Sequence, residues 1–270
     1  ISAQDPFETG FIGWLLAKKY KIKLQIQIHG DYFGSGFWRK ETLLNRFRYY
    51  LGRFIIKKAD SIRVVSNRTK NSLVKLGLAP DKIIIVPIYS INNKQLTANI
   101  KKNTDKFVFL TVGRLVKVKN ISLQIEAMAE VVKKYQTAQL WIMGDGPMRR
   151  KKKKKIARLA SRAKRENLRP SGDHPQSGKL SDNVKLLGWK EGEEMTEIYK
   201  NADVFLLTSN YEGWSLAAIE AASFCLPIIM TDVGCAGEII KNNENGIVVP
   251  VGDKEGLQRA MIELIENGEL

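Results

Sequence analysis

The chain has 270 residues, of which 44% are apolar, and a formal net charge of +16. This length allows one large domain or two modest ones, and the apolar content suffices for packed cores. No run of about 18 apolar residues is present, which argues against a membrane-spanning helix. Cys225 and Cys235 lack the spacing of a metal site, so we expect reduced thiols and a cytoplasmic location.

The positive charge is unevenly distributed along the chain. Residues 1–105 hold 19 Lys or Arg against 7 Asp or Glu, and residues 106–270 hold 25 against 21, so the two parts carry +12 and +4. Such a field attracts polyanions, which include anionic lipid headgroups, phosphorylated acceptors and nucleic acid. The sign of the charge does not choose among these partners.

The first part of the chain alternates between helical and extended patterns. An apolar helix is expected over residues 11–17, and a helix over residues 41–58 mixes aromatic with basic side chains. The second helix either faces a core with a solvated cationic side or contacts an anionic membrane surface, and the two alternatives are compatible. Apolar alternation predicts strands over residues 24–28, 61–65 and 82–86.

The second part alternates more regularly. Strands are expected near residues 107–112, 138–143, 184–187, 203–207, 227–230 and 246–249, with helical patterns between them. This alternation predicts a doubly wound parallel sheet.

A polar stretch separates the two parts. Residues 87–105 are rich in Asn and Lys and predict a linker, so we expect a first domain with its linker over residues 1–100 and a second over residues 101–270. The first domain has only about three predicted strands, and the chain opens at Ile1 rather than at Met. We therefore expect the first domain to be incomplete, through truncation at the N-terminus.

A turn followed by a helix comes directly after the predicted strand at residues 203–207, and the helix begins near Ser215. In a parallel sheet, a helix N-terminus at this end of a strand favours an anion such as a diphosphate. A helical path at about 1.5 Å per residue separates Glu212 from Glu220 by roughly 12 Å. This distance is long for a catalytic dyad and suits the two ends of a nucleotide-sugar, with solvated surface charges as the alternative.

Two further loops follow predicted strands. Gly113 and Arg114 come directly after one strand, with Lys119 just beyond, and cations in such a loop can meet phosphate. Gly144 ends the next strand, where the absence of a side chain allows close backbone approach. Each of these features is also common in loops that bind nothing.

The spacing Ser209-x-x-Glu212-Gly213-x-x-Leu216-x-x-x-Glu220 resembles the Glu-x7-Glu signature of retaining glycosyltransferase family 4, whose fold is called GT-B. The resemblance implies two Rossmann-like doubly wound parallel-sheet domains that face a cleft. It also implies that Glu212 contacts the donor sugar and that Glu220 contacts the ribose of a nucleotide-sugar.

The same resemblance assigns the other candidate residues. Arg114 and Lys119 match the two cations that hold the donor diphosphate, and His29 matches a histidine near the anomeric carbon. The turn at Gly144 and the segment at Gly188 match backbone that contacts the nucleotide. The donor-binding set implied in this way is Gly113, Gly144, Gly188, Gly213, Trp214, Ser215, Leu216 and Glu220.

One part of the motif departs from the family's usual pattern. Trp214 and Ser215 stand where Phe and a small residue are common, which leaves the donor's identity harder to infer. Backbone N–H groups over residues 214–216 can still bind phosphate, whatever their side chains.

The resemblance implies a retaining hexosyltransferase with no metal and no cofactor. It would move a hexosyl group from a nucleotide-diphosphate sugar to a glycan, lipid-linked or small-molecule acceptor, as in polysaccharide biosynthesis. The basic first domain adds the expectation of peripheral contact with an anionic membrane surface. The residues expected to be catalytic are His29, Glu212, Arg114 and Lys119.

Two alternatives remain open. One is a basic nucleic-acid-binding module, and the other is a truncated donor-binding protein without turnover. Seven consecutive cations at Arg149–Lys155 would serve the first, but residues 149–165 contain no aromatic side chain to stack on bases, so we do not expect nucleic acid as a partner. No clustered carboxylates or His/Cys spacing supports a metal site.

Overall fold

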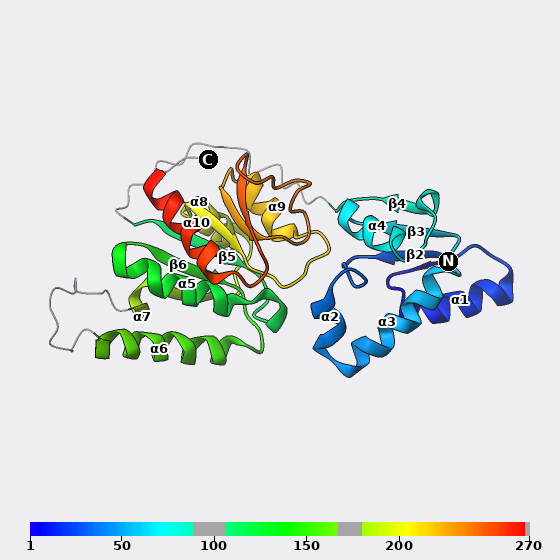
Figure 1. The fold of residues 1–270 in the computed structure, drawn as a ribbon, viewed down its shortest axis with the longest axis horizontal. Coiled ribbons are helices and arrows are strands. Elements are labelled where there is room, and N and C mark those ends of the chain that lie inside the picture. Colours follow the sequence, from blue (N-terminus) through cyan, green and yellow to red (C-terminus); the bar gives the residue numbers. More distant parts are fainter. Residues whose placement is uncertain (89–105, 167–179, 268–270) are drawn as a thin grey trace. The chain divides into compact units, whose positions relative to one another are not determined.

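The computed structural model describes residues 1–88, 106–166 and 180–267, drawn in Figure 1. These residues form two compact units. Unit 1 comprises Ile1–Tyr89, Tyr211–Leu216 and Val233–Glu238, and unit 2 comprises Ser90–Asn210, Ala217–Asp232 and Ile239–Leu270. Most of the predicted linker at residues 87–105 lies outside the described residues, and so does His174, which its polar sequence surroundings predict to be solvent-exposed.

Unit 1 is built on a four-stranded parallel sheet in the order β1-β2-β3-β4. Burial alternates along β2 and β3, as expected for strands whose side chains point to opposite faces. The three strands predicted for this part are confirmed, whereas β1, two residues long, is too short to leave a periodic pattern. The strand bounds are β1 Ser2–Ala3, β2 Gln25–Ile28, β3 Ser61–Val64 and β4 Ile83–Ile85.

Three helices, α1 Glu8–Tyr20, α3 Leu43–Ile56 and α4 Asn67–Val74, pack on this sheet through buried apolar side chains, including Ile55, Ile56 and Leu73. The first is longer than the predicted 11–17. The helix predicted over 41–58 is confirmed as α3 and begins after Thr42, because this residue is extended, with φ −142° and ψ 158°, and its hydroxyl accepts a hydrogen bond from Asn45 N at 3.0 Å. The short helix α2 precedes it and was not predicted. The helix bounds are α1 Glu8–Tyr20, α2 Gly36–Glu41, α3 Leu43–Ile56 and α4 Asn67–Val74.

Unit 2 holds six parallel strands in the order β7-β6-β5-β8-β9-β10. All six strands predicted for this part are confirmed to within two residues. The chain builds outward from β5 through β6 to β7 and then returns to β8, so the strand order reverses between β5 and β8. The bounds are β5 Val108–Val112, β6 Gln139–Met143, β7 Val184–Gly188, β8 Val204–Leu207, β9 Ile228–Thr231 and β10 Gly246–Val249.

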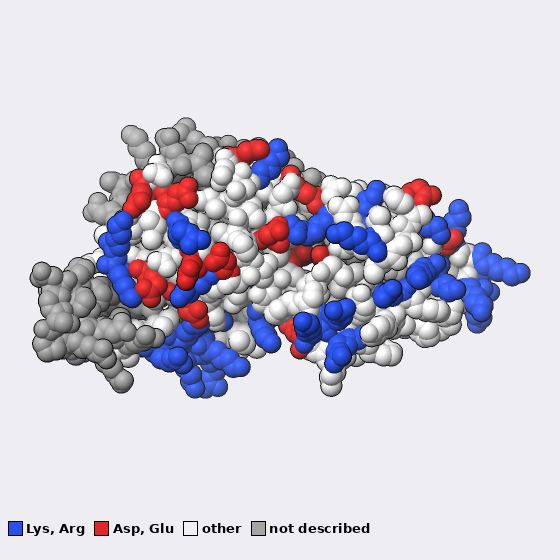
Figure 2. Space-filling model, in the orientation of Figure 1, with Lys and Arg blue, Asp and Glu red and all other residues white. Residues whose placement is uncertain are grey.

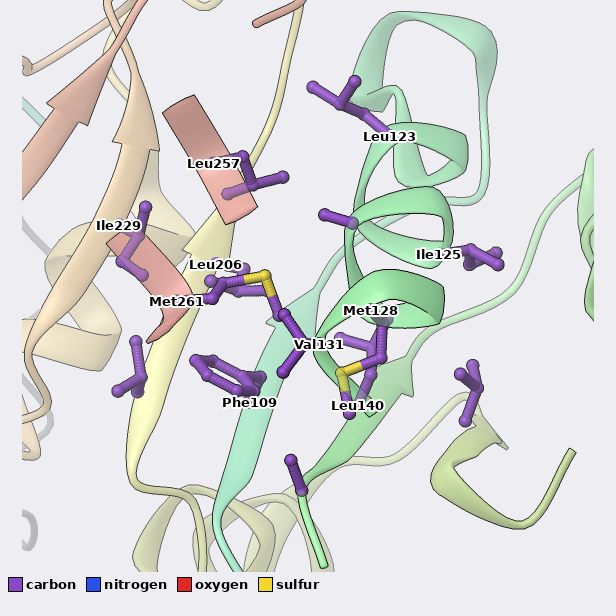
Figure 3. Packing of buried hydrophobic residues seen from close by; sticks show 14 of the residues in the cluster. Phe109, Leu123, Ile125, Met128, Val131, Leu140, Leu206, Ile229, Leu257 and Met261 are labelled. Carbon is purple, nitrogen blue, oxygen red and sulfur yellow. The ribbon is translucent and has the colours of Figure 1, made fainter. Parts of the chain in front are cut away.

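Helices cover both faces of this sheet. On one face, α5 and α10 pack against β5, β6, β8 and β9 through residues such as Met128, Val131 and Met261 (Figure 3), and α6 and α7 join the same core. Phe205 alternates with Leu206 along β8 and stacks with Tyr199 on the other face. The bounds are α5 Ile121–Lys134, α6 Arg149–Glu166, α7 Leu180–Asn183, α8 Gly192–Lys200, α9 Leu216–Ser223 and α10 Lys254–Asn267.

Candidate functional site

The loop after β5 leaves the sheet at the point where the strand order reverses, which is where open α/β sheets bind ligands. Gly113 N donates to Met143 O at 3.0 Å, and Leu115 N donates to Asp145 O at 2.8 Å. Leu115 is buried and Arg114 is exposed. The buried leucine thus anchors the loop, and the adjacent guanidinium is left at its surface.

Lys119 lies over the same loop. A Cβ added to Gly113 would lie 3.6 Å from Lys119 Cε, so the lysine side chain runs past this glycine. The backbone of the lysine is held by Thr208, whose hydroxyl donates to Lys119 O at 3.2 Å. The structure therefore brings Gly113 and Lys119 together, whereas Lys117 is exposed.

The glycines predicted to contact the nucleotide form a chain of backbone contacts across the ends of three strands. Gly144 N donates to Gly188 O at 2.7 Å, which ties the ends of β6 and β7 together. A Cβ on Gly144 would lie 2.1 Å from Gly113 O. Because no side chain fits in that space, glycine at position 144 is required for the loops to meet.

An arginine that sequence reasoning grouped with the solvated lysine run lies beside these glycines. A Cβ on Gly188 would lie 3.6 Å from Arg149 Nη2, and Arg149 Nη1 donates to Asp145 Oδ2 at 2.8 Å. A backbone hydrogen bond from Gly146 and the pairing with Arg149 hold the pKa of Asp145 below its ordinary value. The spacing of four residues between Asp145 and Arg149 was the available sequence signal.

Glu220 of α9 is half-buried and has a partner that the sequence did not reveal. The hydroxyl of Tyr199 donates to Glu220 Oε2 at 3.0 Å. Tyr199 is completely buried and stacks on Phe224 with ring centroids 4.7 Å apart. Burial, and secondarily the charge of Glu220, raise the pKa of Tyr199, so the phenol stays protonated and orients the carboxylate.

In unit 1, the turn that carries Glu212 adjoins the end of β2. A Cβ on Gly213 would lie 1.7 Å from His29 O and 2.9 Å from Gly30 Cα. The two backbone segments are thus in direct contact, and only glycine fits at position 213. Glu212 and His29 consequently belong to neighbouring segments of the same unit.

The three residues after Gly213 differ from one another in exposure. Trp214 is buried and its Nε1 donates to Ile88 O at 2.9 Å, whereas Leu216 is exposed and begins α9. Ser215 has a φ of +72°, a region that L residues rarely adopt, and is 5% exposed. Within the described residues its Oγ has no hydrogen-bond partner.

His29 follows β2 and is half-buried. Its Nε2 shares a hydrogen bond of 3.2 Å with Gln4 Oε1. Burial and, to a lesser degree, the charge of Arg63 hold the pKa of His29 below its ordinary value. The imidazole is therefore neutral at pH 7.

A second carboxylate of unit 1 was missed by sequence reasoning. Glu238 accepts hydrogen bonds of 3.0 Å from Asn67 N, Asn67 Nδ2 and Arg68 N, at the N-terminus of α4. These bonds fix the segment at residues 233–238, which includes the buried thiol of Cys235. Burial and neighbouring carboxylates raise the pKa of this thiol to about 12.

The described residues offer neither a cluster of metal ligands nor a membrane-spanning helix. Residues 1–88, 106–166 and 180–267 contain no group of three or more His, Cys, Asp or Glu side chains placed to hold a metal ion. Within the same ranges, no helix combines the length and the apolar content that crossing a membrane requires.

Two parallel α/β units, with glycine loops and cations at the strand ends of one of them, define a protein of the GT-B glycosyltransferase fold. Comparison with known proteins agrees. The model of the family described as glycosyl transferases group 1 matches residues 106–267, and that of glycosyltransferase family 4 matches residues 1–88. The chain belongs to the glycosyl transferases group 1 family, of the family 4 type.

Individual relatives are moderately similar. An uncharacterized glycosyltransferase of Methanocaldococcus jannaschii, MJ1607, is 32% identical over 255 residues, 89% of this chain and 60% of the relative. The alpha-monoglucosyldiacylglycerol synthase of Acholeplasma laidlawii is 26% identical over 283 residues, covering 98% and 66%. The chain thus spans two thirds or less of the length of these relatives.

Solved structures support the fold. The structure of Anabaena HepE in complex with UDP superposes with a TM-score of 0.75 at 16% identity, over 97% of this chain and 68% of that chain. At identity this low, the similarity shows a shared fold and says nothing about the ligand.

Proposed function

We propose that this chain is part of a retaining hexosyltransferase that uses a nucleotide-diphosphate sugar. The observation that carries the proposal is the set of loops where the strand order of unit 2 reverses. There Lys119 lies beside Gly113, the neighbouring glycines meet through their backbones, and Arg114 stays exposed. This arrangement suits a diphosphate, which needs cations and close backbone approach.

The two cations have an electrostatic role in the proposed reaction. As the bond between sugar and diphosphate breaks, negative charge grows on the departing diphosphate. Arg114, Lys119 and the N-terminus of α9 would stabilise that charge, a role that requires no metal. Activity that persists in EDTA would support this part of the proposal, and loss that Mg²⁺ restores would contradict it.

Glu220 would fix the nucleotide by accepting hydrogen bonds from the ribose hydroxyls. Its carboxylate is already oriented by Tyr199, whose hydroxyl occupies Oε2 at 3.0 Å. An oriented acceptor loses less conformational entropy when the ligand binds. Gly144 and Gly188 would contact the nucleotide through their backbones.

In unit 1, Glu212 would contact the donor sugar, and His29 would lie near its anomeric carbon. The neutral state of His29 suits hydrogen bonding to a sugar hydroxyl. Retention at the anomeric carbon is inferred from the spacing of Glu212 and Glu220 in the family's motif. An NMR assignment of the product's anomeric configuration, compared with that of the donor, tests it.

A calorimetric titration tests donor binding. UDP-, GDP- and ADP-sugars should first be screened by thermal shift, and the best ligand titrated into the native chain and its variants. Lys119→Ala and Glu220→Gln should each weaken binding at least about tenfold, because a lost charged hydrogen bond costs roughly 1.5–3 kcal/mol. Lys117→Ala is the matched control, and equal losses in it and in Lys119→Ala would contradict the assignment.

We also propose that α3 contacts the anionic surface of a membrane from the cytoplasmic side. Its exposed apolar side chains Leu43, Phe47, Tyr50 and Phe54 recur at i, i+4, i+7 and i+11, and their exposed fractions run from 44% to 80%. They form one stripe opposite the buried face at Ile55 and Ile56. Arg46 and Arg53 lie on the same helix.

Such a helix can lie in the interface of a bilayer, with aromatic residues inserted and cations at the headgroups. Similarity to the alpha-monoglucosyldiacylglycerol synthase, whose name denotes a lipid product, adds support for a lipid-linked acceptor. Sedimentation with phosphatidylglycerol vesicles should capture the chain, and Phe47→Ser with Tyr50→Ser should release it. Equal capture by phosphatidylcholine vesicles would contradict the role of charge.

A further inference from the structure

A second concentration of positive charge lies in unit 2, on the helix α6. Figure 2 shows Lys and Arg side chains gathered along it, and its first seven residues are all cations. A run of like charges is expected to be solvated. One member departs from that expectation, because Lys152 is only 3% exposed.

Lys152 lies at the wall of a cavity between α5 and α6 with a volume of about 610 Å³. From α5 the cavity is lined by Ser122, Glu126 and Ala129, which recur at i, i+4 and i+7 and so share one face of the helix. Its cationic lining is Lys151, Lys152, Lys154, Lys155, Arg158 and Lys254. The residues predicted to bind the donor do not line it.

The charges of this cavity are unbalanced. Among the residues that the structure describes, six cations line it against two carboxylates, a formal excess of four. Both carboxylates are already engaged, since Glu126 pairs with Lys155 and Glu130 pairs with Lys133 at 2.7 Å. The excess charge is therefore not neutralised by the acidic side chains that the described residues place here.

The arrangement is electrostatically unfavourable for the helix itself. The N-terminus of a helix carries partial positive charge, so cations in the first turns are placed at the wrong end. Lys151, Lys154 and Lys155 also repel one another at spacings of three and four residues. An anion bound in the cavity would offset both costs.

Lys152 indicates where in the cavity such an anion would bind. Its Nζ donates to Ser122 Oγ at 2.6 Å, which engages one of the three N–H groups of the ammonium. Burial and then the charge of Lys155 lower the pKa of Lys152, and Glu126 opposes them. The ammonium is thus desolvated and gains more than an exposed lysine would from an anionic partner.

We propose that this cavity binds a small, multiply charged anion of the oligophosphate class. Its volume lies in the range of small-molecule sites. A bilayer surface is too flat to meet a lysine that is buried in the cavity wall, and the described part of α6 lacks aromatic side chains on which nucleic-acid bases could stack. The inference is independent of the proposed glycosyl transfer.

The test is a titration of the whole chain with inorganic tripolyphosphate, in the Arg114→Ala and Lys119→Ala background, which removes binding at the proposed donor loops. Lys151→Gln with Lys154→Gln should weaken binding at least about tenfold, equivalent to about 1.4 kcal/mol. The matched control is Lys153→Gln, an exposed cation of the same helix that does not line the cavity, and it should change affinity less than about twofold.

A second variant distinguishes a loss of anion binding from a loss of folding. Lys152→Met keeps the buried volume, so the melting temperature without ligand should not fall, while the rise caused by tripolyphosphate should disappear. Equal weakening by Lys153→Gln and by Lys154→Gln alone would show diffuse attraction and overturn the proposal. Binding to phosphatidylglycerol vesicles or to RNA without binding to tripolyphosphate would overturn it as well.

Discussion

Replacing Gly213 by alanine tests the contact between the Glu212 turn and the end of β2. The new Cβ would lie 1.7 Å from His29 O, and the backbone must move by at least 1.3 Å to reach even a tight distance of 3.0 Å. Overpacking of this kind costs roughly 1–3 kcal/mol where side chains can yield. Because the obstructing atoms here are backbone, we expect Gly213→Ala to cost about 3 kcal/mol.

Urea unfolding of the native chain and the variant measures this loss, and a fall in melting temperature of about 6–12 °C should accompany it at roughly 2–4 °C per kcal/mol. Gly36→Ala is the control, since a Cβ at this first residue of α2 meets nothing within 4 Å. It should leave stability unchanged or raise it by about 0.4–1 kcal/mol. Equal stability of the two variants would refute the close approach.

Three further predictions concern single side chains. Tyr199→Phe removes the hydroxyl that orients Glu220, so the free energy of unfolding should fall by about 1–3 kcal/mol. Calorimetry should also show weaker nucleotide binding, and unchanged affinity would show that Tyr199 has no role in binding. The folded pKa of His29 is depressed, so its contribution to stability is present above about pH 6.5 and is lost as pH falls through the folded pKa. His29→Gln should therefore lose less stability than the native chain on acidification, as measured by urea unfolding at several pH values, and parallel losses would contradict the shift. Burial raises the pKa of Cys235 to about 12, whereas Cys225 is exposed. Mass spectrometry after brief alkylation at neutral pH should therefore find label on Cys225 alone. Labelled Cys235 in the folded chain would refute its burial.

The fold could be predicted well where the sequence carries local periodicity. All residues of β8 and β9 are buried, so these strands read as continuous apolar runs bounded by polar residues. The short helix α2 was not predicted, and α3 was predicted to begin two residues before its first residue, Leu43. The local signal for the start of α3 was Thr42, a residue type that often caps helices, whose hydroxyl accepts a hydrogen bond from the N–H three residues later.

The residues of the candidate site also divide into those that the sequence could place and those that it could not. Arg114 and Lys119 come soon after β5, and Glu220 lies in the helix that follows β8, so their places followed from the predicted alternation of strands and helices. Partners distant in sequence did not, because Tyr199 meets Glu220 only through the packing of α8 and α9. The contact of Gly213 with His29 likewise joins segments more than 180 residues apart, and no local pattern encodes it.

The most direct test of the proposed function is an experimental structure of the chain with the nucleotide-diphosphate ligand that gives the largest thermal shift. Our proposal predicts the diphosphate beside Arg114 and Lys119, with the ribose hydroxyls on the carboxylate of Glu220. A nucleotide bound elsewhere, with those three side chains unengaged, would contradict it.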